Sequence, residues 1–185
     1  LSGRTFVVGG EGARTFYYHV IDEAGNQSEV MSGTVQVDTV PPLSMIQITG
    51  AVGDNGWYRS TVGVTISITD ATSGPEPGEI YHRLDSGPWV KGNTVGISTD
   101  GDHVLEHYGV DRAGNRGQPV ESPVRVDTTP PLAPTALTPS PTAWTNHDGF
   151  SIVWTPPADT SGIAGAYYKL DAEPTYNTDG IFVPN

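Results

Sequence analysis

The stretch DRAGNRGQPVESPVRVDTTPPL occupies residues 111–132, and DEAGNQSEVMSGTVQVDTVPPL occupies residues 22–43. The two stretches lie 89 positions apart, and their gap-free alignment extends back to Gly12 and Gly101, with 12 of 32 pairs identical. A self-similar period defines the structural unit of a chain. The sequence therefore predicts a unit of about 89 residues that begins near each Pro-Pro pair.

The repeat divides the chain into three predicted parts. Residues 1–41 match only the last strands of a unit, residues 42–130 make one whole unit, and residues 131–185 match only a first half. Because the chain starts at Leu1 rather than Met, we expect it to be a segment of a longer array. The Pro-rich stretch 128–144 predicts a semi-rigid linker and an irregular edge strand, since proline cannot donate to a ladder.

Apolar and polar residues alternate within the whole unit. Val62, Val64 and Ile66 are separated by Gly and Thr, which is the period of a strand with one buried face. Turn signals recur every 8–12 residues, and no window carries a convincing helical period. About seven short strands predict an all-β, antiparallel two-sheet sandwich. We expect Val64, Ile66, Leu84 and Leu105 to line its core.

The pentapeptides DEAGN and DRAGN lie between predicted strands. Asp accepts hydrogen bonds from backbone amides two residues on, and Gly permits positive φ. The pattern therefore predicts a hairpin turn between the last two strands of each unit, with a structural role. The turn residues are Asp22, Gly25, Asn26, Asp111, Gly114 and Asn115.

Calcium binding is the alternative role for several aspartates. Carboxylate oxygens are the ligands that Ca²⁺ prefers. Each turn, however, supplies one carboxylate without D-x-D-x-D spacing, so turn capping and linker fixing account for the same residues. We predict no cofactor, with calcium as the alternative. The candidates are Asp22, Asp38, Asp111 and Asp127, together with Asp70 and Asp159 in the TSG loops.

The stretch HVLEH at 103–107 matches H-x-x-E-H, a zinc-protease pattern. That motif needs a helix to bring both histidines and the glutamate together. A strand instead places His103, Leu105 and His107 on one face and Glu106 on the other. No third ligand, Ser-His-Asp order or phosphate loop is apparent, so we predict neither a zinc site nor an enzyme.

The four tryptophans could stack on sugar rings. A strand tryptophan in a sandwich is more often part of the core, and this interpretation is taken for Trp154. Trp57 and Trp144 match in position at strand starts, so both are expected to be structural. Trp89 is the best candidate for an exposed ring, which keeps a surface glycan as an alternative partner.

The charge of the chain limits its partners. It has 9 Lys and Arg against 21 Asp and Glu, a formal net charge of −12. This argues against nucleic acid, which needs a basic footprint, and against docking on an anionic membrane. No apolar run approaches the roughly 18 residues of a membrane helix, so no membrane insertion is predicted. Cysteine is absent, which excludes thiol chemistry.

The order of these motifs resembles bacterial Ig-like and fibronectin type III-like tandem repeats of secreted and cell-surface proteins. The resemblance covers essentially the whole chain and implies tandem immunoglobulin-like β-sandwiches, one complete and two half units. It also implies an extracellular or cell-surface location, with spacing, stalk-building or adhesion as the function and no catalytic residues. The motifs are Trp57, the run 62–69, TSG at 72–74, YHRLD at 81–85, DRAGN at 111–115 and VRVDTTPP at 124–131.

The sequence thus predicts a head-to-tail stalk, sheath or filament. The alternative is an accessory or carbohydrate-binding module of a secreted hydrolase or adhesin. Each half unit alone would leave apolar side chains in water, at roughly 1.5–3 kcal/mol each. We therefore expect adjacent copies of the chain to complete one another, through covalent continuity or strand complementation. The side chains concerned are Phe16, Tyr18 and Val20 in one half and Phe150, Ile152 and Trp154 in the other.

Overall fold

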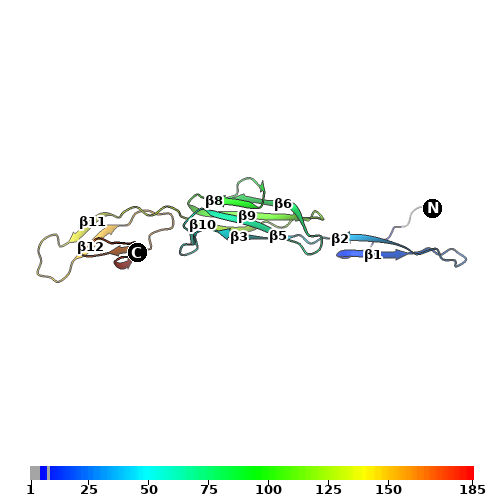
Figure 1. Ribbon diagram of the computed structural model, residues 1–185, viewed down its shortest axis with the longest axis horizontal. Helices are drawn as coiled ribbons and strands as arrows, with labels where there is room; N and C mark the ends of the chain where they lie inside the picture. The colour runs from blue at the N-terminus through cyan, green and yellow to red at the C-terminus, as the bar shows by residue number, and fades with distance from the viewer. Residues whose placement is uncertain (1–4, 8) are drawn as a thin grey trace. The chain divides into compact units, whose positions relative to one another are not determined.

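The computed structural model describes residues 5–7 and 9–185 (Figure 1). These residues form strands and turns, and no helix occurs among them. The predicted all-β fold with antiparallel sheets is therefore confirmed. None of the described residues belongs to a helix long and apolar enough to span a bilayer. Residues 1–4 and 8 of the predicted half unit 1–41 lie outside the described residues.

The chain divides into two compact units. The first comprises Leu1–Thr49, Gly63–Gly96 and His103–Val124. The second comprises Gly50–Val62, Ile97–Asp102 and Arg125–Asn185. Both units take strands from the central part of the sequence, and the predicted unit bounds at residues 41 and 130 stay a prediction.

Two sheets occupy the central part of the sequence. The smaller has the order β3-β5-β8, from β3 (Leu43–Thr49), β5 (Val62–Thr69) and β8 (Thr94–Ile97). The larger has the order β4-β10-β9-β6-β7, from β4 (Trp57–Tyr58), β6 (Pro75–Leu84), β7 (Val90–Lys91), β9 (Gly101–Asp111) and β10 (Val120–Val126). The pairs β3–β5, β6–β7 and β6–β9 are antiparallel, whereas the short β4 lies parallel to β10.

Strand β5 shows why the alternating sequence folds as it does. Val62, Val64 and Ile66 are each at most 2% exposed, whereas Thr65 and Ser67 face solvent. Leu105 on β9 is completely buried, so the predicted core positions on these two strands are confirmed. Leu84, also predicted for the core, is only half-buried because it ends β6 at a turn.

Two contacts bring the smaller and larger sheets face to face in a β-sandwich-like arrangement. A Cβ atom added at Gly109 of β9 would lie 2.4 Å from Cγ2 of Ile68 on β5, so only glycine allows this approach. The Ser44 hydroxyl on β3 lies 2.6 Å from Nδ1 of His107 on β9. The buried apolar side chains are Val62, Val64, Ile66, Ile97, Leu105, Tyr108, Val124 and Val126.

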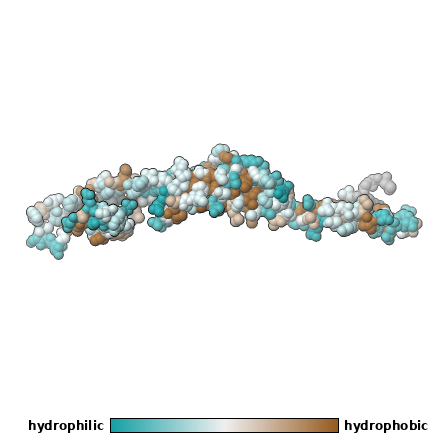
Figure 2. Space-filling view, viewed as in Figure 1, coloured by the Kyte–Doolittle hydropathy of each residue, from teal (hydrophilic) through white to brown (hydrophobic). Residues whose placement is uncertain are grey.

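The remaining strands form three two-stranded antiparallel sheets. These are β1 (Gly12–Tyr18) with β2 (Met31–Val37), β11 (Thr135–Ser140) with β12 (Ser151–Thr155), and β13 (Gly165–Tyr168) with β14 (Ile181–Pro184). Figure 2 shows apolar residues at the surface of the parts that hold these sheets as well as on the central part. Two strands alone cannot enclose a core, which explains these exposed side chains.

The side chains predicted to complete a neighbouring unit are exposed to different degrees. Phe16 is half-buried, because its ring lies over Gly33 of β2. Trp154, predicted as a core residue, is also only half-buried on β12. The exposed fractions of the other four are 48% for Tyr18, 65% for Val20, 58% for Phe150 and 42% for Ile152.

Trp57 and Trp144, predicted to occupy equivalent positions, differ in their exposure to solvent. Trp57 is half-buried in β4, and the Arg125 guanidinium lies 5.8 Å from its ring centre. Trp144 is fully exposed, so its predicted structural role is wrong for this structure. The reason is local: Trp144 lies in the irregular segment between β11 and β12 rather than at the start of a strand.

His107 is a polar group inside the sandwich. It is 1% exposed and is hydrogen-bonded at Nδ1 to Ser44 and at Nε2 to Ser122 on β10, the latter at 3.2 Å. Two hydroxyls satisfy a neutral imidazole, since each can donate or accept. Burial lowers the pKa of His107 because the charged form loses its water.

We expect the melting temperature to fall as the pH is lowered from 7 to 5. The lowered pKa means that the unfolded chain takes up a proton first, so this stability is present above the ordinary histidine pKa and is lost below it. One proton changes the free energy of unfolding by at most about 1.4 kcal/mol per pH unit. Calorimetry of the wild type and His107→Gln measures this, and equal pH slopes in both would contradict the assignment.

Candidate functional site

The DRAGN turn connects β9 to β10 and is held by the side chain of its first residue. Asp111, 1% exposed, accepts hydrogen bonds from the Asn115 backbone amide and the Asn115 side-chain Nδ2, each at 2.8 Å. Gly114 has φ +90°, a conformation that glycine adopts without strain. The residues of this motif therefore form one closed turn.

The DEAGN turn between β1 and β2 repeats this geometry. Asp22 Oδ1 accepts hydrogen bonds from the backbone amides of Ala24 and Asn26, and its Oδ2 accepts one from Asn26 Nδ2 at 2.8 Å. Gly25 has φ +91°. The hydrogen bonds from Asn26 lower the pKa of Asp22, because they stabilise its charged form.

Asp38, in the linker after β2, joins two loops of the first unit. Its Oδ1 accepts a hydrogen bond from the Val40 amide at 3.0 Å, and its Oδ2 accepts one from the Ser73 amide at 2.9 Å. Its carbonyl oxygen accepts a third, from Asn115 Nδ2 at 3.0 Å. The linker is thus bound both to the TSG loop after β5 and to the DRAGN turn.

Asp70 closes the TSG loop. One of its carboxylate oxygens, Oδ1, accepts hydrogen bonds from the amides of Thr72, Ser73 and Gly74 at 2.8–3.0 Å. The Ser73 amide is therefore shared between Asp70 and Asp38. This sharing brings two carboxylates from different segments to the same loop.

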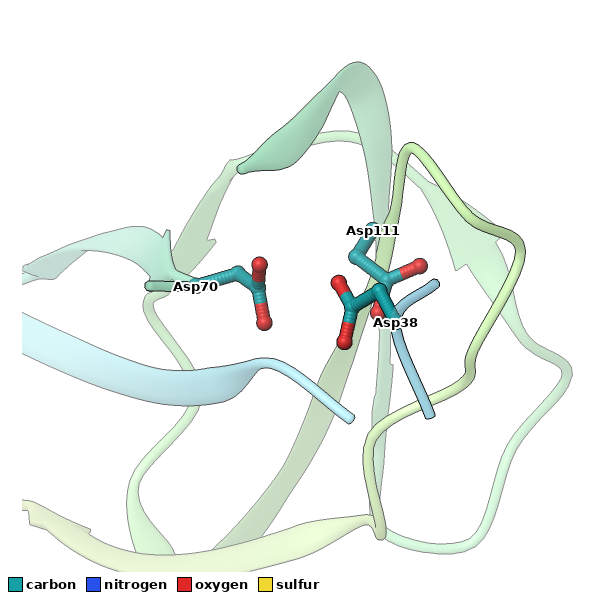
Figure 3. Close-up of side chains that lie close together, drawn as sticks. All are labelled: Asp38, Asp70 and Asp111. Atoms are coloured by element: carbon teal, nitrogen blue, oxygen red, sulfur yellow. The ribbon is translucent and has the colours of Figure 1, made fainter. Parts of the chain in front are cut away.

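Three carboxylates converge at this place (Figure 3). Asp38, Asp70 and Asp111 each present one oxygen, and these oxygens lie within 4.8 Å of one another. The sequence singled out each of the three separately, but it gave no reason to bring them together. The other calcium candidates, Asp22, Asp127 and Asp159, do not join this group.

Hydrogen-bond donors compensate the charge of the cluster. Five backbone amides and one side-chain amide donate to the three carboxylates, from Val40, Thr72, Ser73, Gly74 and Asn115. The hydrogen bond from Ser73 lowers the pKa of Asp38, and burial opposes this effect. A hydrogen bond donated by an amide to a carboxylate stabilises its charged form.

The chemistry of the cluster allows two roles. Ca²⁺ takes six to eight oxygen ligands, so three carboxylates could supply part of a calcium shell. The same oxygens already accept the amide hydrogen bonds that close both loops and hold the linker. Absence of a cofactor, with calcium as the alternative, therefore stays a prediction.

A similar set of hydrogen bonds holds the linker in the second unit. Asp127 Oδ1 accepts a hydrogen bond from the Thr129 amide at 3.2 Å, and its Oδ2 accepts one from the Ser161 amide at 3.1 Å. Asp159 also accepts from the Ser161 amide, at 3.1 Å. Asp127 and Asp159 therefore share an amide as Asp38 and Asp70 do, 89 positions later in the chain.

The histidines of HVLEH lie on β9 and do not converge. His103 Nδ1 lies 2.8 Å from Asp85 Oδ2, whereas His107 faces the two serines of the sandwich interior. Glu106 points to the opposite face, where it accepts two hydrogen bonds from Arg83. This is the strand geometry expected from the sequence, in which the two histidines serve different contacts.

Trp89, predicted to be the best exposed ring, is half-buried instead. Its ring meets Tyr108 edge to face at 4.8 Å, and the Arg83 guanidinium lies 4.8 Å from its centre. Tyr108 is in turn stacked on Tyr81 at 5.1 Å and lies 3.9 Å from the Arg116 guanidinium. The rings of Trp89, Tyr108 and Tyr81 on this outer face thus contact one another and two arginines.

The sequence matches no known protein-family model and no curated protein. The fold and the site define the class of the protein. It is an all-β protein with antiparallel sheets, and aspartate side chains accept hydrogen bonds from the loops next to its linkers.

We expect Asp111→Asn to lower the free energy of unfolding by about 1 kcal/mol, since one of its two acceptor oxygens becomes a donor that faces Asn115 Nδ2. Chemical denaturation measures the change. Asp54→Asn is the matched control, because Asp54 is exposed and only its backbone oxygen accepts a hydrogen bond. If both variants lose the same free energy of unfolding, the side-chain hydrogen bonds of Asp111 do not stabilise the turn as expected.

We expect EDTA to leave the melting temperature unchanged, because amide donors already compensate the cluster of Asp38, Asp70 and Asp111. Calorimetry in EDTA and in calcium chloride measures this. A melting temperature that rises with Ca²⁺ in the wild type but not in Asp70→Ala would assign the cluster as a calcium site instead.

Proposed function

We propose that the protein is a non-enzymatic, extracellular structural repeat protein. Its immunoglobulin-like units follow one another head to tail and build a surface stalk, sheath or filament. The observation that carries the proposal is a hydrogen bond that recurs in the repeat. Asp38 accepts it from the Ser73 amide of the next TSG loop, and Asp127 accepts it from the Ser161 amide of the following one. A spacer needs such contacts at every junction, and the chain has them at equivalent positions.

The strand bounds support a tandem arrangement. β2 and β10 cover Met31–Val37 and Val120–Val126, which differ by 89 positions at both ends. β1 and β9 begin at Gly12 and Gly101, which differ by the same number. The repeat of the sequence is therefore accompanied by a repeat of strands and turns.

The linkers combine two restraints that would make a junction stiff. The Pro-Pro pairs at 41–42 and 130–131 fix φ and bias the preceding residues toward extended backbone. The aspartates before them hold the linker amides and the following loop at once. A linker that is restrained by both covalent geometry and hydrogen bonds transmits direction from one unit to the next.

A carbohydrate-binding module is the alternative function. Trp144 is fully exposed and lines an open hollow of about 470 Å³ together with Phe150 and His147. One exposed ring is less than the row of rings that a sugar platform uses. Binding of a soluble polysaccharide that is lost in Trp144→Ala would favour this alternative.

We expect Asp38→Ala and Asp127→Ala to make the junctions flexible. Each change removes a hydrogen bond to the following loop and one to the linker itself. Small-angle X-ray scattering should show a broader distribution of dimensions than in the wild type, and Asp54→Ala should not. If the distributions of all three variants equal that of the wild type, the junctions are not held by these aspartates.

A further inference from the structure

In a two-stranded sheet each strand has one free edge. Among the described residues, β1 pairs with β2 alone and β13 with β14 alone. In the larger sheet the inner strands have two neighbours each: β9 lies between β10 and β6, and β6 lies between β9 and β7. A free edge with unpaired amides and carbonyls is a template for another strand.

The repeat relates these short sheets to the larger one. A shift of 89 positions places β1 on the start of β9 and β2 on β10. YYKLD at 167–171 repeats YHRLD at 81–85, which places β13 on the end of β6. Each of the two strands pairs antiparallel with the next strand along the chain: Tyr81 of β6 lies opposite Lys91 of β7, and Tyr167 of β13 lies opposite Phe182 of β14.

The two free edges are therefore complementary. The free edge of β1 is the edge at which β9 holds β6, and the free edge of β13 is the edge at which β6 holds β9. Placed side by side, the order β2-β1-β13-β14 reproduces β10-β9-β6-β7. β11 and β12 then take the places of β3 and β5 in the opposite sheet.

We propose that β13 of one copy of this chain pairs antiparallel with β1 of a second copy, in the register that β6 and β9 use. This inference rests on the proposed repeat function and specifies its contact. In the larger sheet His82 lies opposite His107, and Leu84 lies opposite Leu105. The repeat converts these pairs into Tyr168 opposite Tyr18 and Leu170 opposite Phe16.

The second unit exposes apolar side chains on both faces of β13, because Tyr167 and Tyr168 are consecutive residues of one strand. Four rings in the second unit are 41–58% exposed, and they alone hold about 400 Å² of accessible surface if half of each ring is open. A stable interface buries about 800 Å² on each partner. The aliphatic side chains of Ile152, Leu170 and Ile181, each 42–61% exposed, add to this area. The rings are those of Phe150, Tyr167, Tyr168 and Phe182.

A hollow also lies beside β13 in the second unit. The hollow, of about 540 Å³, lies between the segments of β12 and β13, and Trp154, Ile163 and Tyr167 line it. Trp154 is half-buried there.

Cross-linking between two single-cysteine variants tests the register, because the chain contains no cysteine of its own. Tyr18→Cys and Tyr168→Cys, carrying different tags, are mixed under mild oxidation. Opposite residues of adjacent strands have the Cα separation of a disulfide. We expect their heterodimer to form at least about tenfold faster than that of Tyr17→Cys with Tyr168→Cys, since Tyr17 points to the other face.

A second measurement does not depend on any variant. Sedimentation of the wild-type chain should show association that grows with concentration and continues beyond the dimer, because each copy has one edge of each kind. A chain that stays monomeric, or a Tyr17 heterodimer that forms as fast as the Tyr18 heterodimer, would overturn the pairing. These outcomes leave the stiffness of the Asp38 and Asp127 junctions untouched, so failure of the pairing and failure of the repeat function are distinguishable.

Discussion

The hydrogen bond from a backbone amide to an aspartate oxygen is the interaction on which the rest of this structure depends. Asp22 and Asp111 close the turns between paired strands, and Asp38 and Asp127 hold the linkers. An amide left without a partner in a buried loop costs about 1–3 kcal/mol. A short acidic side chain provides that partner at positions where no neighbouring strand can.

The same interaction explains how an acidic protein tolerates three carboxylates in one place. The net charge of −12 offers little basic surface to compensate them. Amide dipoles take this role, and the Asn115 side chain donates both to Asp111 and to the carbonyl oxygen of Asp38. The asparagine of the pentapeptide is therefore as important as its aspartate, because it ties the turn to the preceding linker.

The larger sheet uses its two faces differently. Its inner face contains the buried His107 between two serine hydroxyls, and its outer face carries Tyr108 under the Arg116 guanidinium. Among the described residues, no buried side-chain nitrogen or oxygen lacks a hydrogen-bond partner. Buried polar groups that are all satisfied favour one packing arrangement over its competitors, because any slip in register would leave them unpaired.

The sequence by itself determined the local structure. The alternation of Val62, Val64 and Ile66 predicted a strand and its buried face, because strand geometry has a period of two. The pentapeptides predicted tight turns, since the hydrogen bonds of Asp111 run to a residue only four positions away. The repeat of 89 residues predicted that strands and turns would recur at equivalent positions.

Only the tertiary structure decided which distant residues meet. Asp38, Asp70 and Asp111 belong to three segments, and strand pairing rather than sequence spacing brings them within 4.8 Å. Trp89 was expected to be exposed, but Arg83 and Tyr108 from neighbouring strands cover it. The reason is physical: a period of two fixes the face of a side chain, whereas its neighbours on that face depend on the order and register of strands far apart in the chain.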